Sequence, residues 1–188
     1  MESGAADDAV VNGVKTPTTR RWWAILVAVV TIVGIDQLTK AWAVAALSDG
    51  PISIIGNTVE FTLTRNGGSA FGRFQGMTPL LALGAIVVTV FLVRSVQQAS
   101  DGWVVVALTL VLGGAAGNLT DRLVRSPGFL SGHVVDFIKV GWWPVFNVAD
   151  SCITVGAVLL VARSLFAPAP SRTSRAGSGS QPSVGSDD

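Results

Sequence analysis

Long apolar runs separated by short polar segments dominate this sequence. A helix needs about 20 apolar residues to cross the hydrocarbon core of a bilayer. The runs of that length are 22–47, 78–97, 103–124 and 147–166. The pattern therefore predicts four transmembrane helices. We interpret the first as a retained helix, because it is too long for a cleavable signal peptide and carries Asp36 and Lys40.

The first loop between the predicted helices has a shorter period. Residues 58–64 alternate strictly, with Val59, Phe61 and Leu63 on one face, which is typical of a strand. Residues 51–55 predict a second strand, joined to the first through Gly56 and Asn57. The expected fold class is an all-α membrane protein, with four transmembrane helices and a small extracytoplasmic β-rich lobe.

Composition agrees with this picture and suggests the domain limits. Hydrophobic residues make up 49% of the chain and charged residues 13%, against about 25% charged in a soluble domain. One intramembrane domain is expected at 21–167. Residues 1–20 and 168–188 are rich in small and polar residues without apolar periodicity, so they are expected to be disordered cytoplasmic tails.

Charge suggests the orientation and argues against nucleic acid as a partner. Basic residues near helix ends gather on the cytoplasmic side, and seven are expected there against four in the other loops: Lys15, Arg20, Arg21, Arg94, Arg163, Arg172 and Arg175. Both termini are therefore expected in the cytoplasm. The net charge of +1 offers no basic stripe for nucleic acid, and no Cys/His cluster suggests a metal.

Two Asn-x-x-Asp blocks carry the candidate chemistry. Asn118 and Asp121 lie near the end of the third predicted helix, and Asn147 and Asp150 lie at the start of the fourth, at the same depth. An ionised Asp at the bilayer centre costs about 2.5 to 3.5 kcal/mol. Two neighbouring carboxylates share one proton and so supply an acid and a base, as in aspartic proteases. Spacing alone leaves catalysis, proton or ion coupling, and structural pairing open.

Five short blocks narrow these alternatives. They are DQLTK at 36–40, NGGSAFG at 66–72, GNLTDRL at 117–123, VVDF at 134–137 and FNVADS at 146–151. In this order they resemble the motifs of lipoprotein signal peptidases, the signal peptidase II family of intramembrane aspartic peptidases. The resemblance covers about residues 22–166 and excludes the tails.

The resemblance implies a multi-pass enzyme of the bacterial cell membrane. Such an enzyme removes signal peptides from diacylglyceryl-modified prolipoproteins by cleaving before the lipidated cysteine. Two aspartates activate water, with no metal or organic cofactor, and the partners are prolipoproteins and membrane lipids. By the same resemblance the catalytic aspartates are Asp121 and Asp150.

The other matching positions imply substrate binding or support of the two acids. These residues are Asp36, Lys40, Asn66, Gly68, Asn118, Arg122, Asp136 and Asn147. Simpler roles remain open for some. Asp36 and Lys40 are four residues apart and could neutralise each other. Arg122 points about 100° away from Asp121 on a helix, so it could contact lipid headgroups or Asp136.

Four further points concern packing, the place of His133 and two alternative functions. Small residues at 113–117 predict close packing of helices, and His133 is expected at the surface. A proton-coupled carrier would use Asp36, Asp121 and Asp150 as a relay. A non-catalytic membrane assembly factor would keep the fold and use its polar residues only for pairing.

Overall fold

Four helices form the body of the protein. The computed structural model describes residues 19–68 and 78–166. The helices are α1 (Thr19–Ala46), α2 (Thr78–Gln98), α3 (Gly102–Val124) and α4 (Val148–Phe166), and each is long and apolar enough to cross a membrane. The four-helix prediction is confirmed, with every boundary within three residues. Of the expected tails, 1–18 and 168–188 lie outside the described residues, while residues 19 and 20 already belong to α1.

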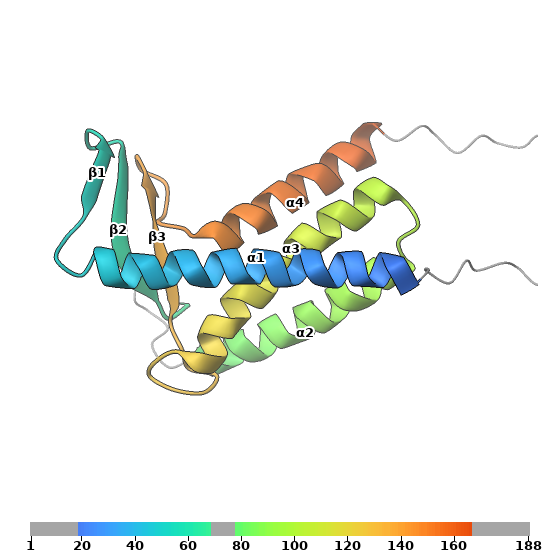
Figure 1. Cartoon of the computed structure of the whole chain (residues 1–188), viewed down its shortest axis with the longest axis horizontal. Coiled ribbons are helices and arrows are strands. Elements are labelled where there is room, and N and C mark those ends of the chain that lie inside the picture. Colours follow the sequence, from blue (N-terminus) through green and yellow to red (C-terminus); the bar gives the residue numbers. More distant parts are fainter. Residues whose placement is uncertain (1–18, 69–77, 167–188) are drawn as a thin grey trace, which may run out of the picture.

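A three-stranded antiparallel sheet stands across one end of the helices (Figure 1). Its strands are β1 (Ile52–Ile55), β2 (Val59–Asn66) and β3 (Val134–Val140), in the order β1-β2-β3. The sequence predicted the first two strands and did not predict β3. In the ladder between β2 and β3, Arg65 lies opposite Val135 and Thr64 lies opposite Asp136. Since side chains alternate along a strand, Val135 and Asp136 face opposite sides of the sheet.

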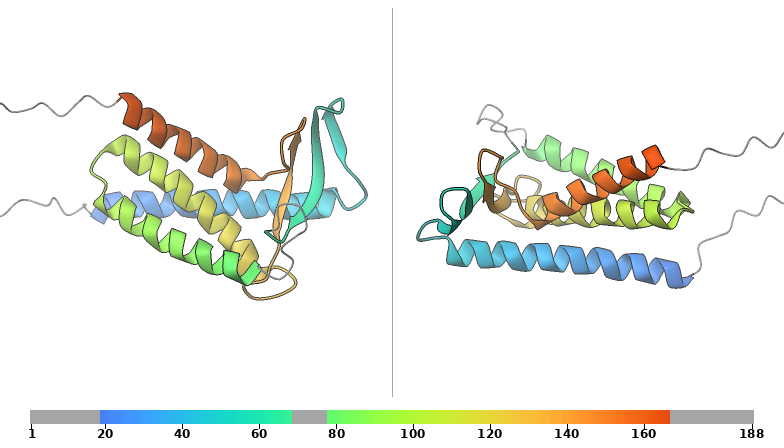
Figure 2. Two further views of the ribbon diagram at one scale, coloured as in Figure 1. Left: turned by 180° about the vertical axis from the view of Figure 1, so that it is seen from behind. Right: turned by 90° about the horizontal axis from the view of Figure 1, so that it is seen from above.

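Helix α3 lies at the centre and packs against each of the other three helices (Figure 2). Its glycines allow this close approach. A Cβ added at Gly113 would lie 2.8 Å from Cδ1 of Ile32 on α1, and one added at Gly114 would meet the backbone oxygen of Ala149 on α4. The close packing predicted from residues 113–117 is confirmed. It brings the end of α3 beside the start of α4.

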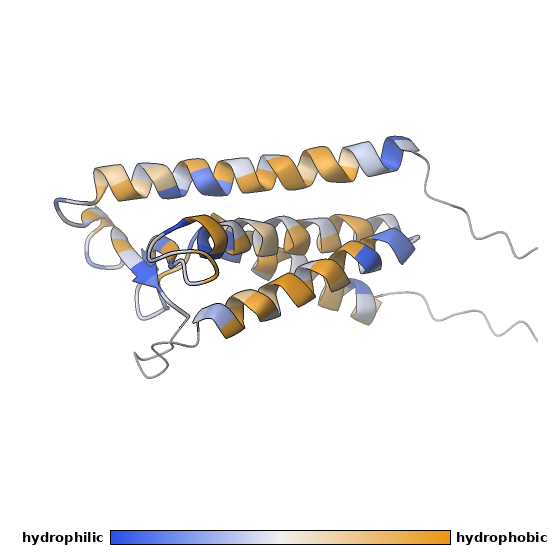
Figure 3. Ribbon diagram, turned by 90° about the horizontal axis from the view of Figure 1, so that it is seen from below, coloured by the Kyte–Doolittle hydropathy of each residue, from blue (hydrophilic) through white to orange (hydrophobic). Residues whose placement is uncertain are grey.

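All four helices carry exposed large hydrophobic residues. In Figure 3 most of the helical ribbon has the colour of hydrophobic residues, and hydrophilic residues occur toward the sheet and at the far helix ends. Near the sheet five polar side chains are at most 3% exposed: Asp36, Lys40, Asp121, Asp136 and Asn147. Burying a charge without partners is costly. The contacts of these five residues therefore decide what this end of the molecule can do.

The opposite end of the helices is held by simpler polar contacts. Asp101 caps the start of α3 by accepting hydrogen bonds from the amides of Trp103 and Val104, and its carboxylate lies 2.6 Å from Arg163 of α4. Arg94, expected in the loop before α3, instead lies within α2. The first residues of α1 and the last residues of α4 also lie here, away from the sheet (Figure 1).

Candidate active site

The carboxylate of Asp121 lies in the last two turns of α3, and both of its oxygens are occupied. Oδ2 lies 2.9 Å from Nζ of Lys40 and accepts from the amide of Val135 at 3.1 Å. Oδ1 lies 2.7 Å from Nε of Arg125 and accepts from Nε2 of Gln37 at 2.9 Å. Two cations and two neutral donors therefore surround a carboxylate that is 0% exposed. Such a group is satisfied as an anion.

Lys40 links this carboxylate to two other elements. Its Nζ lies 2.8 Å from Oδ2 of Asp36, 2.9 Å from Oδ2 of Asp121 and 2.9 Å from Oδ1 of Asn118. An ammonium group has three donors, so the three acceptors match it. The other oxygen of Asp36 accepts from the amide of Ala149 at 3.0 Å. The Asp36–Lys40 ion pair, one of the roles left open by the sequence, is present, and its contacts tie α1 to α3 and α4.

The second Asn-x-x-Asp block forms the start of α4. Oδ1 of Asn147 accepts from the amide of Asp150 at 2.9 Å, and the Asn147 amide donates to Oδ2 of Asp150 at 3.3 Å. This reciprocal pair is a capping box, and α4 accordingly begins at Val148. Nδ2 of Asn118 donates to Oδ1 of Asp150 at 2.8 Å. Within the part of the chain that the structure describes, no Lys or Arg forms an ion pair with Asp150.

Asp136, on β3, is the acid that interacts with Asp150. Its Oδ1 accepts from Nδ2 of Asn147 at 2.6 Å and its Oδ2 from Nδ2 of Asn66 at 3.2 Å. Burial, followed by the nearby charge of Asp150, raises the pKa of Asp136 to about 6. Asn147 bonds to both carboxylates. Asp150 therefore influences the ionisation of Asp136, and neither acid has an ion-pair partner in residues 19–68 and 78–166.

This arrangement differs from the pairing expected from the sequence. Among the described residues, no hydrogen bond joins Asp121 to Asp150. Asn118 lies between them, accepting from Lys40 and donating to Asp150. The catalytic role of Asp121 stays a prediction, and the geometry does not favour it, because an acid with two cations on its oxygens cannot share a proton cheaply.

Arg122 lies near Asp136 and Asp150, and Gly68 lies beside Arg122. The guanidinium of Arg122 interacts electrostatically with Asp121, Asp136 and Asp150. Its Nη1 is buried, and in the described ranges it has no hydrogen-bond partner. A Cβ added at Gly68, which has φ +89°, would lie 3.6 Å from Nη2 of Arg122. Of the two contacts left open by the sequence, lipid headgroups and Asp136, Arg122 therefore has the electrostatic interaction with Asp136.

Three groups at this site were missed by the sequence analysis: Gln37, Arg125 and the amide of Val135. The spacing of Asp121 and Arg125, four apart on one helix, was a usable signal. Nothing in the sequence showed that Gln37 or the Val135 amide would reach Asp121. Among residues 19–68 and 78–166, no group of three or more His, Cys, Asp or Glu side chains could hold a metal ion. The expected absence of a cofactor stays a prediction.

A comparison with protein families accounts for these blocks. Residues 27–166 match the model of the family described as signal peptidase (SPase) II. The chain belongs to the signal peptidase II family. It is therefore an aspartic peptidase, and its four apolar helices make it a multi-pass bacterial membrane protein.

Curated relatives in this family carry the name lipoprotein signal peptidase. The protein of Rhodococcus jostii is 46% identical over 169 residues, which is 89% of this chain and 85% of the relative. That of Mycolicibacterium smegmatis is 49% identical over 148 residues, and the match spans 78% of this chain and 63% of the relative. Membership supports signal-peptide removal from prolipoproteins as the activity.

A solved structure has the same fold. It is described as a bacterial membrane enzyme determined by the in meso method at 1.9 Å resolution. It superposes with a TM-score of 0.67 at 28% sequence identity, over 78% of this chain and 95% of that one. The fold class predicted from the sequence, four membrane helices with a small sheet, is confirmed.

Proposed function

We propose that this chain cleaves diacylglyceryl-modified prolipoproteins immediately before the lipidated cysteine, with Asp136 and Asp150 activating water. The observation that carries the proposal is the coupling of these two carboxyl groups. Both bond to Asn147, and the charge of Asp150 helps to raise the pKa of Asp136 to about 6. Two acids that cannot both ionise cheaply supply one proton donor and one base.

In this mechanism the proton shared by the pair resides on Asp136, whose burial favours the neutral form. Asp150 is held in place by Asn118 and by the start of α4. It takes a proton from water as the water oxygen attacks the scissile carbonyl, and Asp136 donates its proton to the carbonyl oxygen. As the tetrahedral intermediate collapses, Asp150 gives its proton to the leaving amine and Asp136 recovers a proton from a hydroxyl of the intermediate, which restores the pair.

The substrate lies beside apolar helices in this proposal. The signal-peptide helix and the acyl chains remain in the bilayer, so positioning contributes much of the rate. The start of α1 and the end of α4 lie away from the sheet (Figure 1). The seven-to-four bias of basic residues then puts both termini in the cytoplasm and the sheet, with both acids, at the outer surface.

The direct test is cleavage of a purified diacylglyceryl-modified prolipoprotein by the protein in detergent. Asp136→Asn and Asp150→Asn should each lower turnover by about 10²- to 10⁴-fold or more, since an amide cannot relay the proton. Asp49→Asn is the matched control, because Asp49 lies in an exposed turn. An otherwise identical substrate without the lipid should not be cleaved.

Asp121→Asn separates the two assignments of the catalytic pair. If it abolishes cleavage in a folded protein while Asp136→Asn retains turnover, the pair is Asp121 and Asp150, as the sequence predicted. If folded wild-type protein cleaves nothing, the carrier hypothesis gains, and proton flux into vesicles becomes the measurement.

A further inference from the structure

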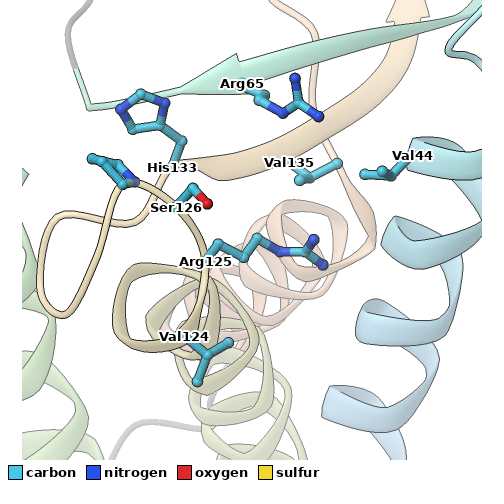
Figure 4. Close-up of a pocket in the computed structure, with 8 residues that line it drawn as sticks. Val44, Arg65, Val124, Arg125, Ser126, His133 and Val135 are labelled. Carbon is cyan, nitrogen blue, oxygen red and sulfur yellow. The ribbon is translucent and has the colours of Figure 1, made fainter.

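A cavity of about 610 Å³ lies on the other side of the β2–β3 ribbon from Asp136. Side chains of β2, β3, the end of α3 and the end of α1 line it, and Figure 4 shows them. The lining residues are Val44, Arg65, Val124, Arg125, Ser126, Pro127, His133 and Val135. None of them belongs to the proposed catalytic pair or to its direct hydrogen-bond partners.

The strand register separates this cavity from the catalytic groups. Arg65 pairs with Val135 across the ladder, so both side chains face the cavity. Asn66 and Asp136 are their chain neighbours and bond to each other on the opposite face. One ribbon therefore has a face with the catalytic acid and a face with a basic cavity.

The charge in the cavity is unbalanced. The negative charges of Asp36 and Asp121 are balanced by the positive charges of Lys40 and Arg125, which form ion pairs with them. Arg65 is exposed, and within residues 19–68 and 78–166 it forms no ion pair.

The two arginines also have donors to spare. Arg125 uses Nε for Asp121 and one Nη2 hydrogen for Gln37, which leaves three of the five donors of its guanidinium. Both guanidinium groups point toward Val135 and Val44 (Figure 4). His133 lines the same cavity as the two arginines.

We propose that this cavity binds a phosphate group, and that in the membrane the group belongs to the headgroup of an anionic phospholipid. Guanidinium forks match phosphate oxygens in pairs, which favours phosphate over a simple halide. The space is many times the volume of one water, about 30 Å³, and so admits a glycerol beside the phosphate. Val44 and Val124, at the helix ends, supply apolar walls where a lipid chain would leave the cavity.

Binding at this cavity bears on the proposed active site through β3. Arg125 holds Asp121, and Asp121 accepts from the Val135 amide, next to Asp136 in the strand. An anion bound by both arginines would link the end of α3 to β2, which pairs with β3, on the face opposite the catalytic acid.

The test measures binding, so its outcome does not depend on whether the proposed peptidase mechanism is right. Dihexanoylphosphatidylglycerol, dihexanoylglycerol and inorganic phosphate are titrated calorimetrically into the full-length protein in a neutral detergent. Saturable binding of the phosphatidylglycerol and none of the phosphate-free dihexanoylglycerol is expected. Arg65→Gln should weaken binding about tenfold or more and Arg65→Lys less, because Lys lacks the fork. Arg94→Gln, an exposed arginine of α2, is the matched control and should change nothing.

A second pair of variants keeps the test independent of Arg65. Ser126 is exposed and lines the cavity, so Ser126→Asp should abolish binding by repulsion while the isosteric Ser126→Asn should not. Inorganic phosphate binding as tightly as the lipid would identify free phosphate as the source of the group. No saturable binding of either phosphate compound, equal binding of dihexanoylglycerol, or equal losses in Arg65→Gln and Arg94→Gln would overturn the proposal.

Discussion

The two Asn-x-x-Asp blocks have the same spacing and different surroundings. In the first, Asp121 lies inside α3 and contacts Lys40 and Arg125. In the second, Asp150 closes a capping box at the start of α4 and interacts with Asp136. The charges around a carboxylate, and not its motif, therefore decide whether it can exchange a proton.

The amides join the two blocks into one network. Asn118 of the first block accepts from Lys40 and donates to Asp150 of the second. Asn147 donates to Asn118 at 3.1 Å and to Asp136 at 2.6 Å. A charge-compensated acid and an uncompensated acid thus share one hydrogen-bonded scaffold, and measurements of stability and of pH dependence can separate them.

The largest difference is expected in stability. Asp121→Asn leaves Lys40 and Arg125 without a carboxylate they both contact, and breaking a buried ion pair from one side costs about 3 to 5 kcal/mol. Asp150→Asn removes no ion pair in the described residues and should cost much less. Thermal unfolding in detergent measures both. Equal losses would mean that the two carboxylates are not distinguished by their cations.

Helix packing should have the next largest effect. At Gly114 an added Cβ meets the Ala149 backbone, whereas at Gly84 of α2 nothing lies within 4 Å. Gly114→Ala should therefore cost about 1 to 3 kcal/mol by overpacking and lower turnover by moving the two blocks apart. Gly84→Ala should be neutral or stabilising by up to about 1 kcal/mol. A harmless Gly114→Ala would show that the blocks tolerate separation.

The pH profile should report on Asp136. Its pKa is raised to about 6, so kcat/KM should fall as the pH rises through this value and the pair loses its one proton. Asn66 donates to Asp136 and lowers its pKa. Asn66→Ala should consequently move the fall to higher pH, while Asp49→Asn leaves it in place. A profile that Asn66→Ala does not shift would remove Asp136 from the titrating pair.

The smallest effect is expected at the ion pair between Asp101 and Arg163. Arg163 lowers the pKa of Asp101, so the stability from this pair is present above the ordinary carboxyl pKa and lost as the pH falls through the lowered value. Both side chains are 32% exposed, and salt should screen them. Asp101→Asn keeps the helix cap, so any change in Tm should disappear in high salt. A loss of stability as large as that caused by Asp121→Asn would show that the exposed ion pair contributes as much as the buried one.

The helices could be predicted closely because their cause is local. A run of about 20 apolar residues must form a helix in a bilayer, whatever its neighbours are. The strands β1 and β2 had alternation and a turn signal. Strand β3 had no alternating pattern and no turn signal. Its first four residues are all buried, and its partner strand, β2, lies some 70 residues earlier in the chain.

The candidate site was predicted as a set of residues, but not as a set of pairs. Asp36 with Lys40 could be found because the two are one helical turn apart. The partners of Asp121 were missed in part because Gln37 is 84 residues away. The family resemblance selected the right region of the chain and could not show which acids carry compensating cations.

Local composition and short motifs were enough to predict the four membrane helices, the first two strands and the membership of a peptidase family. The tertiary structure decided that β3 carries Asp136 to Asp150, that Lys40 and Arg125 neutralise Asp121, and that a basic cavity lies behind the ribbon. The physical reason is that ionisation and anion binding depend on charges within a few ångströms, and only the folded chain brings residues from α1, α3, β3 and α4 that close.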